Sequence, residues 1–78
     1  MDPGLAFGKM LRKVRKEACL TQEQVAHAAG VERIYIGMIE RGERQPTVRV
    51  VFKLANAVNK KASELIVLTE QIVDQSEE

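Results

Sequence analysis

Apolar residues recur along this chain at the spacing of amphipathic helices. The first stripe consists of Phe7, Leu11, Val14 and Ala18. Steps of four, three and four residues place these side chains on one face of a helix. Asp2 can cap this helix, and Pro3 suits its first turn. The first helix is therefore expected from Pro3 to Ala18.

Two shorter helical patterns follow and meet at Gly30. Their shared apolar stripe consists of Val25, Ala26, Ala29, Val31, Ile36 and Ile39. Thr21–Gln24 is a capping box at the start of the helix that precedes Gly30. The helix that follows Gly30 is expected over Arg33–Arg41. A short turn with a glycine that accepts positive φ is typical of a helix-turn-helix, here over residues 22–41. The alternative is an αα-hairpin with no role in binding nucleic acid.

Two further helices are expected in the second half of the chain. One begins after Thr47 and ends near Asn59, which tolerates the left-handed conformation. Its apolar side consists of Val48, Val51, Phe52, Ala55 and Val58, widened by Leu54. The other runs from about Ser63 to Val73. The pattern thus predicts an all-α, five-helix single domain over residues 1–78.

The last helix carries two apolar stripes where a surface helix needs one. Leu65, Leu68 and Ile72 form the first stripe, and Ile66 and Val73 form the second. The excess predicts a homodimer, with these five residues in the interface between two copies related by a two-fold axis. The alternative is that both stripes are buried within the monomer.

Composition excludes several classes of protein. No window approaches 18 apolar residues, so no membrane span or membrane partner is expected, and the N-terminus lacks the features of a signal peptide. Cys19 is the single cysteine, which excludes an intramolecular disulfide and agrees with a cytoplasmic location. We expect Cys19 to pack as a small apolar group.

The net charge of +1 conceals an asymmetry along the chain. Residues 1–62 contain all twelve Lys and Arg residues and six acids, whereas residues 63–78 contain five acids and no base. The body can therefore meet a polyanion while the acidic tail, which includes Glu77 and Glu78, faces away from it.

Catalytic and metal-binding patterns are absent from the sequence. His27 is the only histidine, with no second ligand nearby, and is expected to be a partly exposed helix residue. No nucleophile elbow, glycine-rich phosphate loop or metal-spaced cluster occurs. We therefore expect no enzyme activity, no cofactor and no metal.

The helix expected at Arg33–Arg41 has a definable outward face. If Ile36 and Ile39 point inward, its outward side is Ile34, Gly37, Met38 and Arg41, with Arg33 and Tyr35 on the flanks. The N-terminal part of such a helix enters the major groove of double-stranded DNA, where arginine reads guanine. The predicted base-reading residues are Arg33, Ile34, Tyr35, Gly37 and Met38. The glycine could instead simply ease packing.

A second set of residues is expected to contact phosphates or to stabilise the fold. The predicted phosphate contacts are Lys9, Arg12, Lys13, Gln22, Arg41, Arg44 and Thr47. Simple solvation is the alternative for the basic face of the first helix. Arg15 and Glu40 are expected to form a partly buried ion pair between the first and third helices.

The stretches LTQEQVAHAAGV and YIGMIERGERQPT resemble the Xre family, the lambda-repressor and Cro type of helix-turn-helix, over about residues 5–68. The run RIYIGMIERGER is most similar to controller proteins of restriction–modification systems. The resemblance implies five helices, recognition by the third, and a homodimeric transcriptional regulator on a pseudo-palindromic operator. It also implies a phosphate contact by Gln22, base-facing positions at Arg33, Ile34 and Met38, and RNA polymerase as a further partner.

Some positions depart from the family pattern. Glu32 replaces a Ser or Thr cap, Ile34 replaces a common polar reader, and Cys19 stands where Gly or Asn is frequent. The first two leave the operator sequence open. A protein-interaction module, such as an antitoxin or coactivator-like domain, is the rival interpretation, since the second apolar stripe could bind another protein.

Overall fold

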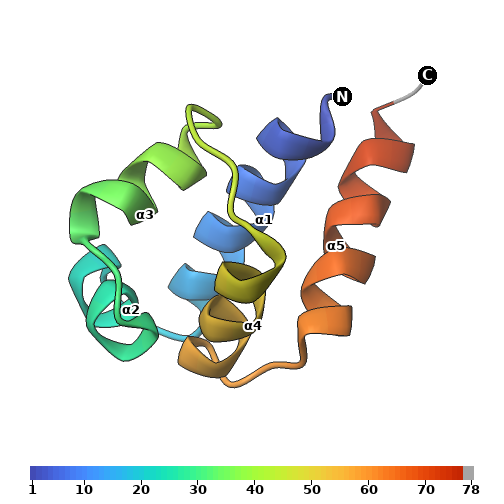
Figure 1. Ribbon diagram of the computed structural model, residues 1–78. Coiled ribbons are helices and arrows are strands. Elements are labelled where there is room, and N and C mark those ends of the chain that lie inside the picture. The colour runs from blue at the N-terminus through green and yellow to red at the C-terminus, as the bar shows by residue number, and fades with distance from the viewer. Residues whose placement is uncertain (77–78) are drawn as a thin grey trace.

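The computed structural model describes residues 1–76, which form five α-helices around one apolar core (Figure 1). The helices are α1 (Pro3–Glu17), α2 (Gln22–Ala29), α3 (Arg33–Glu40), α4 (Val48–Ala57) and α5 (Ala62–Gln75). The predicted all-α fold is confirmed. Glu77 and Glu78 of the acidic tail lie outside the described residues. None of the helices in residues 1–76 has the length and apolar character needed to cross a bilayer.

Side-chain caps fix where the helices begin. The Asp2 carboxylate accepts from the backbone N–H of Leu5 at 3.1 Å. Thr21 and Gln24 form the reciprocal capping box of α2, with hydrogen bonds of 2.9 and 3.1 Å. The Thr47 hydroxyl accepts from the N–H of Val50 at 3.2 Å. Each cap satisfies a backbone donor that has no partner within its own helix.

The start of α5 lies within one residue of the expected start near Ser63. The helix begins at Ala62, because the Glu64 carboxylate accepts from the backbone N–H of Lys61 at 2.8 Å and stabilises an earlier first turn.

Helix α1 lies between the two halves of the molecule. It packs against α3 on one side and α5 on the other, while α4 contacts both α2 and α5. Figure 1 shows α2 and α3 together at one end and α5 at the opposite end. The buried Gly8 permits the closest approach, since a Cβ there would collide with the carbonyl oxygen of Ile39. The end of α3 is therefore seated directly on α1.

The core draws on all five helices. Its fully buried large side chains are Met10, Leu11, Val25, Ile36, Ile39, Leu54 and Leu65. Leu65 is wholly inaccessible to solvent, so its assignment to a dimer interface is corrected: it is a core residue of the monomer. Leu68 and Ile72 also pack against this core and are partly buried. The first stripe of α5 therefore stabilises the monomer itself.

The apolar face of α4 is rotated from the one expected. Leu54 is fully buried, whereas Val48 and Phe52 are 74% and 60% exposed. At 100° per residue, Leu54 and Ala55 centre the buried side, and Phe52 lies beyond its edge. The expectation that Val48 and Phe52 face the core is wrong, and both side chains remain on the surface.

Cys19 is exposed and does not pack as a small apolar group, contrary to expectation. It lies two residues after α1 with φ of 60°, the left-handed conformation in which the chain turns toward α2. Asn59 has the same φ after α4, as predicted. A Cβ is disfavoured in this conformation, and asparagine tolerates it better than cysteine does.

Relief of this strain is a testable source of stability. Cys19→Gly is expected to raise the free energy of unfolding by about 1 kcal/mol, because glycine adopts positive φ without a steric penalty. Urea denaturation followed by circular dichroism measures the change. Cys19→Ala is the control, since it removes the thiol and retains the Cβ. An equal gain in both variants would show that the backbone conformation is not the cause.

Candidate nucleic-acid interface

The carboxylate of Glu40 holds together the two halves of the helix-turn-helix and α1. Arg15 donates to it twice, from Nε at 2.7 Å and from Nη2 at 3.0 Å. Gln22, the first residue of α2, donates from Nε2 to the same carboxylate at 3.0 Å. The third guanidinium nitrogen of Arg15 donates to the carbonyl oxygen of Leu20 at 2.9 Å. Arg15 and Glu40, expected as a pair, are thus part of a larger network.

This network is nearly closed to water. The side chains of Arg15 and Glu40 are 10% and 4% exposed. The hydrogen bond to Glu40 raises the pKa of Arg15, an effect that burial opposes and the negative charge of Glu40 reinforces. Each charge of this poorly hydrated pair depends on the other for compensation.

Removal of one charge from this network should be costly. Glu40→Gln is expected to lower the free energy of unfolding by about 3 kcal/mol, because the Arg15 guanidinium is left in a poorly hydrated position. The double variant Arg15→Met/Glu40→Leu is the matched control and should recover most of the loss, since it leaves no buried charge. Urea denaturation of both variants provides the measurement. A single variant within 0.5 kcal/mol of wild type would contradict the role of the pair.

The outward surface of α3 is shaped around Gly37. Gly37 was predicted to face outward, but it is buried. A Cβ there would lie 3.1 Å from Nη1 of Arg41 and 3.7 Å from Oε1 of Gln22. The space left by the missing side chain is therefore occupied by two polar groups of the protein. The side chains of Gln22 and Arg41 thus cover Gly37 on the outer side of α3, and the glycine is not accessible as a base reader.

Two arginines at and after the end of α3 interact with neighbouring side chains. Arg41 donates from Nε and Nη2 to the two carboxylate oxygens of Glu43 at 2.9 and 3.1 Å. The guanidinium carbon of Arg44 lies 6.0 Å from the centre of the Tyr35 ring, within the range of a cation–π interaction. Both arginines are exposed, so a phosphate can still reach them.

The start of α3 carries exposed side chains. Arg33 is exposed, Ile34 is 60% exposed, and Met38 is half-buried one turn further on. Glu32 occupies the N-cap position, but its side chain makes no cap hydrogen bond. The first turn of α3 therefore offers one cation, one large apolar group and a free carboxylate.

The basic residues of α1 do not all face the same way. Arg12 follows Gly8 by one turn and precedes Arg15 by one turn, so it lies on the side of α1 that meets α3. Lys9 is exposed on the outer face. Lys13 instead lines a shallow depression with Leu68 and Ile72 of α5. Lys13 therefore lies beside α5, and its phosphate contact stays a prediction.

Among residues 1–76, no three His, Cys, Asp or Glu side chains gather as a metal site would require. His27 is exposed on α2, beside Thr21, Glu23 and Gln24 at an open part of the surface. The polar groups that do converge are those around Glu40 and Arg41, beside the accessible first turn of α3.

Comparison with known proteins places this arrangement in a family. The family model described as "Helix-turn-helix" matches residues 11–65, which contain α2, α3 and the network around Glu40. The chain belongs to the helix-turn-helix family. Within it, the chain is 35% identical over 71 residues to the uncharacterized HTH-type transcriptional regulator y4dJ of Sinorhizobium fredii, covering 91% of this chain and 92% of the relative. It is 36% identical over 66 residues to the control protein C.SmaI of Serratia marcescens, covering 85% of this chain and 79% of that protein.

Solved structures of helix-turn-helix proteins show the same arrangement. The restriction–modification controller protein C.AhdI from Aeromonas hydrophila superposes with a TM-score of 0.76 at 38% identity, covering 78% of this chain and 92% of that chain. The controller protein C.Esp1396I superposes with a TM-score of 0.85 at 20% identity, which indicates a shared fold.

Sequence reasoning missed two features of this helix-turn-helix surface. The bond from Gln22 to Glu40 links residues 18 positions apart and leaves no periodic trace in the sequence. The ion pair of Glu43 with Arg41 was also missed; the turn at Gly42, with φ of 76°, brings Glu43 back to Arg41. The juxtaposition of Arg41, Gly42 and Glu43 in the sequence was the available signal.

Proposed function

We propose that this protein is a sequence-specific, double-stranded DNA-binding transcriptional regulator that acts as a homodimer on a pseudo-palindromic operator. The accessible first turn of α3 beside the N-terminus of α2 is the observation that carries the proposal, because this is the part of a helix-turn-helix that enters the major groove. The similarity to C.SmaI and C.AhdI favours the regulator of a restriction–modification system. Such a regulator would act in the cytoplasm, without enzyme activity, and would contact RNA polymerase if it activates transcription.

Each part of the surface has a distinct role in this proposal. Arg33 can donate to O6 and N7 of guanine, and Ile34 can contact the methyl group of thymine. Tyr35 and Met38 flank these readers and contribute at the edge of the reading surface. Gln22 uses one amide hydrogen for Glu40 and has a second with which to bond a phosphate. Phosphate contacts by Lys9, Arg12, Arg41, Arg44 and Thr47 would set the register.

Base reading and phosphate binding can be separated by two arginine variants. Arg33→Ala should cost about 1–3 kcal/mol on the operator and relax sequence preference, because a bidentate contact to guanine is lost. Arg44→Ala should weaken binding to all sequences alike and reduce the salt slope by about 1. Band shifts and anisotropy titrations on DNA flanking the gene, against shuffled DNA of the same composition, measure both effects. Equal loss for Arg33→Ala on both DNAs would remove its reading role.

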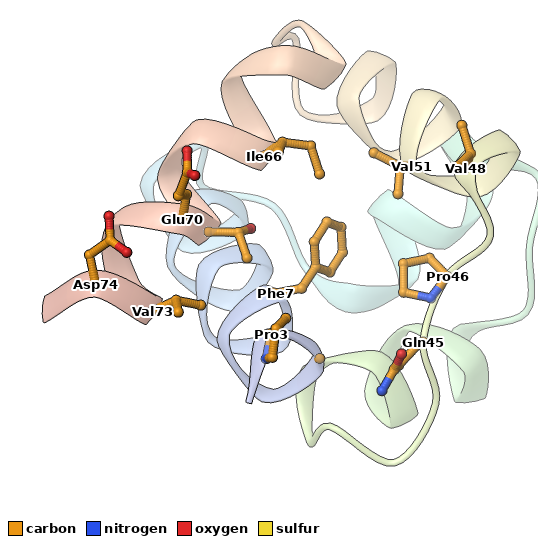
Figure 2. Close-up of a pocket in the computed structure, with 12 residues that line it drawn as sticks. Pro3, Phe7, Gln45, Pro46, Val48, Val51, Ile66, Glu70, Val73 and Asp74 are labelled. Carbon is orange, nitrogen blue, oxygen red and sulfur yellow. The ribbon is translucent and has the colours of Figure 1, made fainter. Parts of the chain in front are cut away.

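An apolar surface between α4 and α5 supports the homodimer. Figure 2 shows a groove with Phe7 at its floor, between Val48 and Val51 on one side and Ile66 and Val73 on the other. The groove has a volume of about 530 Å³, and Ile66 is 51% exposed at its edge. Phe52, one turn after Val48, extends the apolar surface over α4. Single exposed apolar residues are ordinary, but an apolar groove bordered by several of them suits a protein partner.

The proposed dimer surface combines the second apolar stripe of α5 with Val48 and Phe52, the two exposed apolar residues of α4. Phe52→Glu and Ile66→Glu should each shift the protein toward monomer in sedimentation equilibrium, since a carboxylate would be desolvated in the interface. Ile34→Glu, a similar change at an exposed position on α3, should leave the association state unchanged. A wild-type monomer that lacks salt-dependent DNA binding would instead favour the protein-interaction module.

A further inference from the structure

Arg41 is the C-cap residue of α3, and two of its donors already have a partner. Nε and Nη2 are directed to Glu43, and Nη1 lies over Gly37. The side chain is thus folded back along α3. Its planar fork matches both oxygens of a carboxylate, which is the same geometry that it would use for a phosphate.

The backbone after α3 places Glu43 in this position. The N–H of Gly42 donates to the carbonyl oxygen of Ile39 at 3.0 Å, and that of Glu43 donates to Met38 at 2.8 Å. With Gly42 at φ of 76°, the chain reverses over the end of α3, and the Glu43 side chain returns to Arg41. A Cβ at Gly42 would also collide with Leu5, so packing against α1 reinforces this turn.

The ion pair is exposed and can be broken. The side chains of Arg41 and Glu43 are 59% and 54% exposed. The hydrogen bond from Arg41 lowers the pKa of Glu43, which remains a carboxylate at neutral pH. An exposed pair of this kind is weak and is screened by salt, so a DNA phosphate can compete with Glu43 for the guanidinium.

We propose that Glu43 is an internal competitor for DNA phosphate, which holds Arg41 across Gly37 and lowers the affinity that the backbone of any duplex can supply. The inference rests on the proposed DNA-binding function and deepens it. When α3 enters a groove, Arg41 must exchange the carboxylate of Glu43 for a phosphate, and Glu43 then stands as an unpaired negative charge close to the DNA. Non-operator DNA, which offers phosphates and few base contacts, is bound more weakly as a result.

The test uses Glu43→Gln in the whole protein and a fluorescein-labelled duplex of random sequence, followed by anisotropy across a salt series. The affinity should rise about two- to fivefold, the range expected when an exposed ion pair no longer competes. The slope of log K against log salt should change by less than about 0.9, the value for a whole phosphate contact, because Arg41 reaches the same phosphate in both proteins. Glu17→Gln is the control: it makes the same change in net charge on the side of α1 that faces α5.

A second variant separates competition for Arg41 from simple repulsion between Glu43 and DNA. In an Arg41→Gln background, Glu43→Gln should give less than half of its gain in log K, because no guanidinium remains to be released. An undiminished gain in that background, or an equal gain in Glu17→Gln, would overturn the inference. The proposed function would still stand in that case, provided that the wild-type protein binds DNA. Absence of DNA binding by wild type at low salt would overturn the proposed function, and the inference with it.

Discussion

A carboxylate that is almost inaccessible to water needs hydrogen-bond donors from the protein in place of water. The donors to Glu40 come from two other helices. Arg15 reaches it from α1 and Gln22 reaches it from the start of α2, while Glu40 itself ends α3. If either helix moved away from α3, the negative charge of Glu40, whose side chain is only 4% exposed, would be poorly compensated. The angle between α2 and α3 is therefore set by electrostatics as well as by apolar packing. In the proposed function, this angle would decide whether Gln22 and Arg33 can contact one duplex together.

Packing around this point determines what α3 can present. Gly8 seats the end of α3 on α1, and Ile36 and Ile39 bury its inner side completely. Within the first turn of α3, Ile36 is buried in the core and Tyr35 packs against it, whereas Arg33 and Ile34 lie on the other side and are exposed. The residues of α3 that stabilise the domain and those proposed to read DNA thus lie on opposite faces of one short helix.

The parts that could be predicted from sequence are those governed by local rules. The helix periodicities, the Thr21–Gln24 box and the left-handed Asn59 each depend on residues within a few positions, and each is found in the structure. The Arg15–Glu40 contact was accessible because a lone acid at the edge of an apolar face requires a cation. Cys19 was misjudged because burial was inferred from side-chain chemistry, whereas the backbone turn after α1 decides its exposure.

The remaining wrong predictions concern how the helices pack against one another, and the periodicity of apolar residues does not specify this packing. The sequence indicated that α5 has a second apolar stripe. It did not indicate that Leu65 fills the core of the monomer, or that Ile66 borders a groove with Val48. The rotation of α4 that exposes Phe52 depends on how α4 packs against both α2 and α5.

Charge counting has the same weakness at the DNA surface. The excess of basic residues in positions 1–62 predicts a polyanion partner, yet Arg15 and Arg41 are committed to Glu40 and Glu43. Arg44 also lies over Tyr35, and Lys13 lies beside α5. Fewer cations are therefore free around α3 than the sequence suggests. With phosphate attraction reduced in this way, base contacts from the first turn of α3 would supply a larger share of the binding energy, as a sequence-specific regulator requires.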